Sequence, residues 1–259
     1  MSEKKPSLGL RIYAILAYSY IYLPILLLII FSFNTQKLNV RWEGFTLHWY
    51  GELFQDQEVM LAARNTLVIA FVSTIFATVI GTLAALALQR YRFPGHAISE
   101  SLLYIPVIIP EVVMGISLLA FFAQAGIRLG LMTITLSHIA FNIPFVTLVV
   151  RARLHGFDKA IEEAAMDLGA NELTTFWRVT LPTIMPGVMA GAMLAFTLSL
   201  DDYVITYFTA GPGSTTLPLR VFSMVRFAVT PEVNALSALW VLTVFVILGI
   251  GQLIQRKQT

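Results

Sequence analysis

The chain has 259 residues, of which 57% are hydrophobic and only 12% are charged. A soluble domain carries about 25% charged residues, so this composition excludes an ordinary soluble protein and predicts a membrane protein. The net charge of +2 gives no indication of a nucleic-acid partner, and the absence of cysteine excludes disulfides, thiolate chemistry and cysteine metal sites.

The first predicted element is an apolar helix over residues 11–33. Lys4 and Lys5 precede it, which is also the pattern of a secretory signal peptide. The apolar run from Ile12 to Phe33 is longer than the core of a signal peptide, and no small-residue cleavage site follows it. We therefore expect a retained first transmembrane helix.

Apolar segments of similar length recur along the rest of the chain. A helix needs about 20 apolar residues to cross the hydrocarbon core of a bilayer, and six segments qualify. The sequence therefore predicts an all-α integral membrane protein that forms a single domain over residues 1–259. The six predicted spans cover approximately residues 11–33, 65–89, 101–124, 129–151, 184–208 and 236–255.

The distribution of lysine and arginine predicts the orientation of these spans, because cytoplasmic loops are enriched in both residues. With the N-terminus inside, eleven of the 17 lysines and arginines lie in cytoplasmic segments and six lie outside. Both termini are therefore expected in the cytoplasm, together with the long connection 152–183. The connections 34–64 and 209–235 are expected outside, and the aromatic residues of 34–64 are typical of a segment along the membrane interface.

The cytoplasmic connection contains the stretch FDKAIEEAAMDLGANELTTFWRVTLP, residues 157–182. Its pattern predicts two short helices, of which Asp158 can cap the first and Gly169 can end it. Asn171 can cap the second helix, and Pro182 is expected to close it before the fifth span. Spacing alone leaves open whether this hairpin packs on its own bundle or docks on a partner. The first helix carries a narrow stripe of mostly small residues: Ala160, Ile161, Ala164, Ala165 and Leu168.

The same stretch resembles the signature of the permease subunits of bacterial ABC importers, which reads Glu-Ala-Ala, three residues, Gly, nine residues and Ile-x-Leu-Pro. The matching residues are Glu163, Ala164, Ala165, Gly169, Val179, Leu181 and Pro182, with valine in place of the isoleucine. The resemblance implies that the first helix is a coupling helix, which docks into a cleft of a cytoplasmic ATPase. The residues expected to serve this coupling are Glu162, Glu163, Ala164, Ala165, Asp167, Gly169, Leu181 and Pro182.

The resemblance extends over nearly the whole chain, and there the chain looks like the second, C-type permease subunit of the polyamine (spermidine/putrescine) importers. The matching stretches are YLPILLLIIFSFN at 22–34, GFTLHWYGELF at 44–54, RYRFPG at 90–95, FTLSLDD at 196–202, GPGSTTLPLRVFSMVR at 211–226 and PEVNAL at 231–236. Related importers for other solutes share several of these stretches, so another small cationic or organic solute is the alternative substrate.

Membership of this family implies the type I importer permease fold with six transmembrane helices, which works by alternating access in the bacterial inner membrane. It implies a heterodimer with a homologous second permease, two copies of a cytoplasmic ATPase and a periplasmic or extracellular solute-binding protein. It also implies that this chain binds no cofactor and that ATP and Mg²⁺ are held by the ATPase.

Three carboxylates interrupt the predicted spans, where ionisable residues are costly and usually functional. Asp201 lies 18 residues beyond Thr183, near the start of the fifth span, which places it about 27 Å along the helix and in its outer half. Its neighbour Asp202 points roughly 100° away on the same helix, so the sequence leaves open which aspartate faces a pathway. Glu111 lies about 15 Å into the third span, directly after Pro110, which is expected to break or kink the helix.

Carboxylates along a pathway can replace water around the ammonium groups of an extended polyamine, and aromatic rings can add cation–π contacts. We therefore expect the substrate pathway to include Asp201, Asp202, Tyr203, Tyr207 and Glu111. Two structural interpretations stay open. Glu111 can instead cap a broken helix, and the aspartates can instead form hydrogen bonds inside the bundle.

Other classes of protein fit less well. An intramembrane aspartyl protease needs two carboxylates from different helices, whereas Asp201 and Asp202 are neighbours on one helix. A serine protease would need a nucleophile elbow near His138, which is instead expected to be a hydrogen-bonded residue of the bundle. A stand-alone secondary transporter usually shows internal repeats, which we do not find. The chain lacks the GxxxxGK[ST] phosphate-binding loop, so it is expected to be a transport subunit and not an enzyme.

Overall fold

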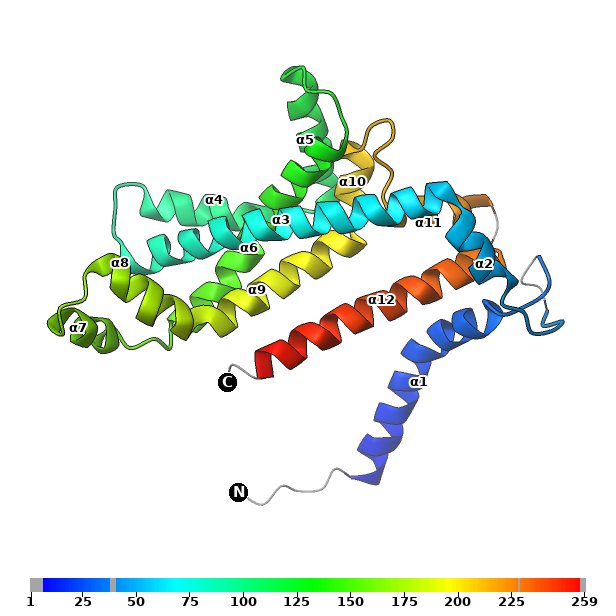
Figure 1. Ribbon diagram of the computed structural model, residues 1–259, viewed down its shortest axis with the longest axis horizontal. Coiled ribbons are helices and arrows are strands. Elements are labelled where there is room, and N and C mark those ends of the chain that lie inside the picture. The colour runs from blue at the N-terminus through cyan, green and yellow to red at the C-terminus, as the bar shows by residue number, and fades with distance from the viewer. Residues whose placement is uncertain (1–6, 38–40, 228, 257–259) are drawn as a thin grey trace. The chain divides into compact units, whose positions relative to one another are not determined.

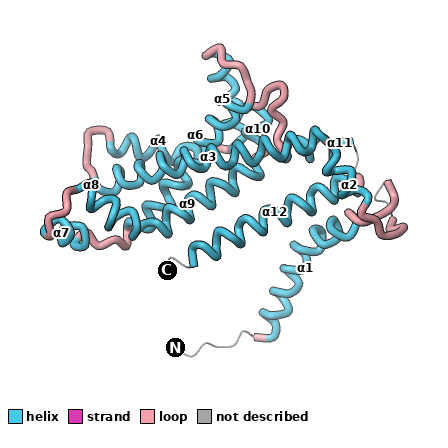
Figure 2. Tube along the Cα trace, in the orientation of Figure 1, coloured by secondary structure: helices cyan, strands magenta, loops and turns pink. Residues whose placement is uncertain are grey.

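The computed structural model describes all residues except 1–6, 38–40, 228 and 257–259. These described residues form helices joined by loops, with one isolated β-bridge between Asn34 and Phe45 (Figures 1 and 2). They form two compact units, Met1–Met60 with Val221–Phe245 and Leu61–Arg220 with Val246–Thr259. The helices are α1 Leu8–Phe31, α2 His48–Gln55, α3 Gln57–Arg90, α4 His96–Ile108, α5 Glu111–Gln124, α6 Leu131–Leu154, α7 Ala160–Asp167, α8 Glu172–Thr175, the π-helical segment η1 Phe176–Thr180, α9 Leu181–Asp201, α10 Val204–Thr209, α11 Leu217–Phe227 and α12 Pro231–Arg256.

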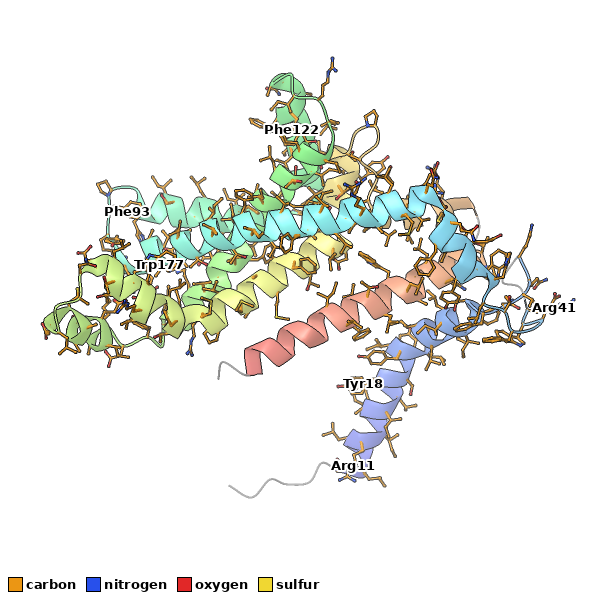
Figure 3. All side chains as sticks on the ribbon, viewed as in Figure 1. Arg11, Tyr18, Arg41, Phe93, Phe122 and Trp177 are labelled. Carbon is orange, nitrogen blue, oxygen red and sulfur yellow. The ribbon has the colours of Figure 1, made fainter. Side chains whose placement is uncertain are left out.

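The first unit begins with α1, an apolar helix that contains no buried residue. Tyr18, for example, is 63% exposed and projects away from the ribbon (Figure 3). A helix that is apolar all round suits a segment covered by lipid. The chain after α1 is folded back by the indole of Trp49, whose Nε1 donates a 2.7 Å hydrogen bond to the carbonyl oxygen of Asn34. Trp42 and Phe45 remain exposed on this segment, and its interfacial location stays a prediction.

The second unit packs α3, α6 and α9 together through small residues. Small side chains let helices approach closely inside a membrane, where packing and interhelical hydrogen bonds hold them together. The hydroxyls of Ser73 on α3 and Ser199 on α9 are 3.1 Å apart, and the Thr147 hydroxyl on α6 donates to the carbonyl of Gly81 on α3 at 3.1 Å. Buried residues spaced four apart comprise Ser73, Ala77, Gly81 and Ala85 on α3 and Gly187, Gly191, Ala195 and Ser199 on α9.

The third predicted span is broken, as the sequence predicted. Helices α4 and α5 are bent by 111° at the break between them. Ile109 and Pro110 have extended backbone there, with ψ of 135° and 137°. Ile109 is extended because a residue before proline avoids the helical conformation. Arg151 of α6 secures α4 by donating to the Glu100 carboxylate at 2.6 Å and to the Tyr104 hydroxyl at 2.8 Å.

The fifth predicted span, 184–208, is not one helix, so that prediction was wrong. Helix α9 ends at Asp201, and Asp202 has an extended backbone with ψ of 119°. A separate short helix, α10, follows at Val204–Thr209. The break is stabilised by the Asp202 carboxylate, which accepts hydrogen bonds from the backbone N–H groups of Ile205 at 3.4 Å and Thr206 at 2.8 Å. These bonds cap the start of the new helix, as an acidic side chain commonly does.

The prediction that Pro182 closes the second cytoplasmic helix was also wrong. Helices α8, η1 and α9 form one uninterrupted helical stretch, Glu172–Asp201. A proline inside an α-helix loses one hydrogen bond and clashes with the carbonyl four residues earlier. Here the five residues before Leu181 are π-helical, and this wider turn lets Pro182 begin α9 without ending the helix.

The all-helical class is confirmed, whereas the count of six spans stays a prediction. Among the described residues, α1, α3, α6 and the stretch Glu172–Asp201 are long and apolar enough to cross a membrane, and the bent pair α4–α5 is a fifth if it forms one span. Within α12, the apolar helix Pro231–Ile247 is shorter. The assignment of residues 1–259 to a single domain likewise stays a prediction.

Candidate functional site

The two aspartates at the end of α9 have different surroundings. The Asp202 side chain is only 5% exposed, and its Oδ1 accepts hydrogen bonds from the Thr206 backbone N–H at 2.8 Å and the Thr206 hydroxyl at 2.7 Å. Asp201, by contrast, is exposed on the surface of the chain. The sequence left open which aspartate faces a pathway, and of the two Asp201 is the accessible one.

His138 of α6 is the second partner of Asp202. Its Nε2 lies 3.2 Å from Asp202 Oδ1 and 2.9 Å from the Thr206 hydroxyl. On the other side of the ring, Nδ1 lies 2.6 Å from the hydroxyl of Ser199, which in turn lies 3.1 Å from that of Ser73. His138 is therefore the hydrogen-bonded bundle residue that the sequence predicted, and the structural interpretation left open for the aspartates applies to Asp202.

Helix α10 is anchored at its other end as well. The Thr133 hydroxyl, at the start of α6, donates a 2.8 Å hydrogen bond to the carbonyl of Thr209, the last residue of α10. Both anchors of α10 thus lie on α6. Hydrogen bonds between transmembrane helices contribute about 0.6 kcal/mol each on average, and those to a charged group contribute about 1.5–3 kcal/mol, so the Asp202 end carries the stronger anchor.

Glu111 comes to the same region from α5, which packs against α10. The contact is closest at Gly115, where no side chain has room: an ideal Cβ would lie 2.6 Å from Cδ2 of Phe208. Glu111 precedes Gly115 by one helical turn, so the two residues share a face of α5. It is exposed and is the first residue of α5, a position where the helix dipole favours a carboxylate.

The two tyrosines lie at α10, with Tyr203 directly before its first residue and Tyr207 within the helix. The rings of Tyr203 and Tyr207 are 5.8 Å apart, and Tyr207 is 59% exposed. The structure therefore brings all the predicted pathway residues to one region. Four of them, Asp201, Glu111, Tyr203 and Tyr207, are at least partly accessible, whereas Asp202 is enclosed.

The predicted cytoplasmic hairpin consists of α7 and α8. Asp158 accepts a 3.0 Å hydrogen bond from the Ala160 N–H, so it secures the first turn from one residue earlier than a standard cap. Gly169 has φ of +91°, and its N–H donates to the carbonyl of Met166 at 2.9 Å; this left-handed ending is the one predicted. Asn171 caps α8 by accepting the Thr174 N–H at 2.8 Å, also as predicted.

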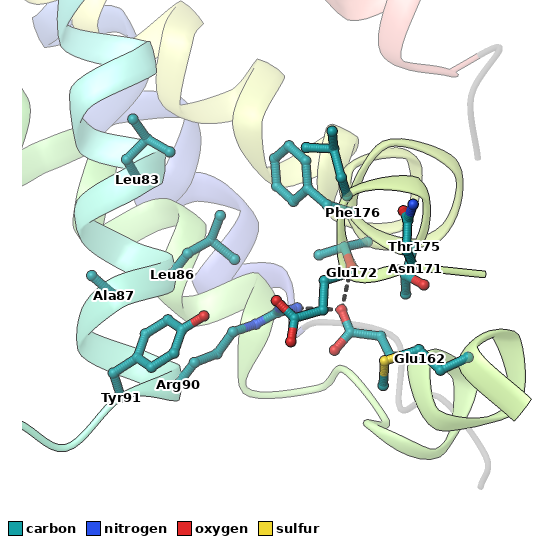
Figure 4. Close-up of a pocket in the computed structure, with 13 residues that line it drawn as sticks. Leu83, Leu86, Ala87, Arg90, Tyr91, Glu162, Asn171, Glu172, Thr175 and Phe176 are labelled. Carbon is teal, nitrogen blue, oxygen red and sulfur yellow. Dashed lines mark hydrogen bonds and ion pairs between the residues drawn. The ribbon is translucent and has the colours of Figure 1, made fainter. Parts of the chain in front are cut away.

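Within α7, Glu162 is the residue that ties the hairpin to the bundle. Its carboxylate pairs with the guanidinium of Arg90, at the end of α3, and accepts the hydroxyl of Thr180 (Figure 4). The opposite face has no partner inside the described part of the chain, since α7 contains no buried residue and Leu168 is 90% exposed. The other predicted coupling residues are accessible as well. Those that are exposed include Glu163, Ala164, Asp167 and Pro182, whereas Ala165 and Leu181 are partly exposed.

A pocket of about 840 Å³ lies between the end of α3 and this hairpin (Figure 4). It is mostly apolar, with the Arg90–Glu162 pair at its edge. Its lining comprises Leu83, Leu86, Ala87, Arg90, Tyr91, Glu162, Met166, Asn171, Glu172, Leu173, Thr175, Phe176 and Thr180. Neither Arg90 nor this pocket was predicted from the sequence, because the partners of Glu162 come from separate segments of the chain.

Comparisons with known proteins identify the family of the chain. A family model described as "Binding-protein-dependent transport system inner membrane component" matches residues 77–258. The spermidine/putrescine transport system permease protein PotC of Escherichia coli K12 is 45% identical over 242 residues, which cover 93% of this chain and 92% of that protein. The putrescine transport system permease protein PotI of the same organism is 44% identical, over 87% of this chain and 83% of PotI.

A solved structure supports the fold independently. A bacterial ABC transporter involved in the import of the acidic polysaccharide alginate has a chain that aligns with a TM-score of 0.74 over 95% of both chains, at 19% identity. Similarity at this level of identity establishes the type I permease fold. Together with the family match and the identity to two curated permeases, it shows that the chain belongs to the inner membrane components of binding-protein-dependent transport systems and is a permease subunit of an ABC importer.

Proposed function

We propose that the chain forms one half of the pathway through which a polyamine, spermidine or putrescine, is imported by alternating access. The names of the two similar permeases support this substrate class. The observation that carries the proposal is the exposed pair Asp201 and Glu111 beside the exposed ring of Tyr207. Two carboxylates and an aromatic ring supply what an extended cation with several ammonium groups needs in place of water.

In this proposal, the five pathway residues have two roles. Asp201, Glu111, Tyr203 and Tyr207 contact the substrate as it passes. Asp202 supports the site from inside the bundle, because its carboxylate is enclosed, already accepts hydrogen bonds from Thr206 and lies 3.2 Å from Nε2 of His138. Enclosed carboxylates with several donors are poorly placed to exchange partners with a moving cation.

Helix α7 is proposed to dock on the ATPase as the coupling helix. A hairpin that only packed on its own bundle would bury its apolar stripe, yet Leu168 and Ile161 are 90% and 48% exposed. The docking face then comprises the exposed or partly exposed members of the predicted set: Glu163, Ala164, Ala165, Asp167, Gly169, Leu181 and Pro182. Glu162 faces the other way and fixes α7 to the membrane bundle, so that force applied to α7 reaches the spans.

The proposed assembly pairs this chain with a homologous second permease, two copies of a cytoplasmic ATPase and an outer solute-binding protein. ATP and Mg²⁺ bind to the ATPase, and this chain binds no cofactor. Both termini lie in the cytoplasm, in keeping with the excess of lysine and arginine in the segments that this orientation puts inside.

The test is uptake of radiolabelled putrescine and spermidine by the complete complex in proteoliposomes, with ATP supplied on the side of the membrane where the ATPase lies. Asp201→Asn removes one carboxylate with little change of shape, and a lost bond to a charged group of about 1.5–3 kcal/mol corresponds to uptake efficiency lower by about tenfold to a hundredfold. Glu52→Gln, which changes an exposed carboxylate on α2, is the matched control and should transport normally. Lack of uptake of both polyamines by the unaltered complex refutes the substrate class, and unaltered uptake by Asp201→Asn refutes the assigned pathway.

A further inference from the structure

We propose that His138 is a positioning residue for the substrate, which holds α10 through Asp202 and Thr206 so that Asp201 and Tyr207 face the pathway. The inference rests on the proposed function, because it concerns the same pathway. His138 is 2% exposed, so it acts through its neighbours and does not touch the substrate.

The hydrogen bonds around His138 fix which ring nitrogen carries the proton. The Thr206 hydroxyl donates to Oδ1 of Asp202, so toward Nε2 both Thr206 Oγ1 and Asp202 Oδ1 act as acceptors. Nε2 must therefore carry the hydrogen. In the neutral ring Nδ1 is then an acceptor, and the Ser199 hydroxyl donates to it at 2.6 Å.

The Nε2–H group thus bridges two residues that belong to the start of α10. That helix has six residues, too few to be stable in isolation, so contacts from α5 and α6 determine its position. The Thr133 hydroxyl holds its end at Thr209, and the Nε2–H of His138 is the side-chain donor from α6 at its start. Loss of this donor leaves α10 attached to α6 mainly through its far end.

The positions of the substrate-facing residues follow from these anchors. Thr206 is buried while its neighbour Tyr207 is 59% exposed, since adjacent helical residues point about 100° apart. Asp202 is enclosed while its neighbour Asp201 is exposed. A rotation of α10 that moved Thr206 away from His138 would therefore turn Tyr207 and shift the carboxylate of Asp201.

Two substitutions separate the two ring nitrogens. His138→Gln places an amide near the Nε2 position and keeps a donor for Asp202 and Thr206, whereas His138→Asn places it near Nδ1 and keeps only the contact with Ser199. We expect His138→Asn to raise the KM for polyamine uptake about tenfold, the effect of 1.4 kcal/mol, with Vmax kept within about twofold. His138→Gln should restore the KM to within about twofold of the unaltered complex.

A second readout does not depend on the substrate. Because the chain has no cysteine, Tyr207→Cys in a complex whose other subunits are cysteine-free gives a single labelling site on α10. The rate of maleimide labelling should change at least threefold when His138→Asn is added and should be unchanged with His138→Gln. Ser137→Ala is the control: Ser137 is the neighbouring buried residue of α6, and its hydroxyl donates within its own helix, to the carbonyl of Thr133.

The outcomes decide between positioning and a general disturbance of α6. A KM and a labelling rate for His138→Asn equal to those of the unaltered protein overturn the proposal, as does an equal effect from Ser137→Ala. If the complex with His138→Asn does not assemble, Thr206→Val is tested in its place, because it removes the bridging hydroxyl but keeps the backbone bond to Asp202. A raised KM for Thr206→Val then supports the proposal, and an unchanged KM overturns it. Absence of all polyamine uptake by the unaltered complex counts against the proposed function alone, since the labelling experiment still tests the role of His138.

Discussion

Gly115→Ala should distort the candidate pathway without touching any charged group. In the structure an ideal Cβ at this position lies 2.6 Å from Cδ2 of Phe208, whereas carbon atoms in contact prefer about 3.5–4.0 Å. Helix α5 must therefore move away from α10 by roughly 1 Å, or the Phe208 ring must turn. Glu111, one turn earlier on α5, moves with the helix relative to Asp201.

The size of the effect follows from two opposing contributions. Inserting a methyl group into a packed interface typically costs about 1–3 kcal/mol, while replacing glycine by alanine inside a helix stabilises it by about 1 kcal/mol. The net expectation is a loss of roughly 0–2 kcal/mol in the free energy of α5–α10 packing. Because the pathway geometry changes as well, we expect the KM for uptake to rise about three- to tenfold.

The assay is uptake in proteoliposomes, with thermal stability of the purified complex measured in parallel. Gly51→Ala is the matched control, because an ideal Cβ on Gly51 of α2 has nothing within 4 Å and the substitution should leave both KM and stability unharmed. The double variant Gly115→Ala with Phe208→Leu should recover most of the lost KM, since the shortened side chain vacates the space. A normal KM for Gly115→Ala, or no recovery in the double variant, contradicts the packing argument.

Two further predictions concern the cytoplasmic hairpin. Glu162→Gln should weaken the attachment of α7 to Arg90 and Thr180, so uptake per ATP hydrolysed should fall severalfold, while Glu52→Gln, which changes an exposed carboxylate outside the hairpin, should leave it normal; equal stoichiometries of transport to hydrolysis in the two variants would disprove this role. Gly169→Ala should destabilise the hairpin by about 1–2 kcal/mol, the cost of a left-handed backbone for a residue with Cβ, and faster amide hydrogen exchange in α7 should report it; unchanged exchange contradicts the prediction.

Sequence reasoning located those features whose causes are local. Gly169 ends α7 and Asn171 starts α8 because the preferences of glycine and asparagine act over three or four residues. The break after Ile109 was predictable for the same reason, since proline constrains the residue before it. The fold class followed from composition and from the length of the apolar segments.

The end of α9 at Asp201 was not predictable from neighbouring residues alone. Asp202 caps α10 in a conformation that also depends on His138, which comes from α6. The apolar pattern of residues 184–208 is equally compatible with one straight helix. A histidine in one predicted span and a pair of aspartates in the next were the available clues, and they indicated hydrogen bonding in the bundle without showing that the helix breaks at Asp202.

The side of α7 on which Glu162 meets the bundle could not be predicted from the sequence for a related reason. Periodicity places it beside the apolar stripe of α7 but does not show which side of the helix meets the bundle. The pairing with Arg90 and Thr180 becomes visible only when α3 and η1 are brought together. A resemblance that marks a whole loop as a coupling element therefore does not separate residues that face the partner from those that fix the loop.

The unbroken helix from Glu172 to Asp201 has a mechanical consequence. Its 30 residues make a rod about 45 Å long, which joins the cytoplasmic hairpin directly to the last residue before α10. A rotation of about 5° about its cytoplasmic end would swing Asp201 by roughly 4 Å over this length. The extended backbone of Asp202 lies directly beyond this rod, so a displacement of the hairpin reaches the carboxylate of Asp201 without passing through a loop.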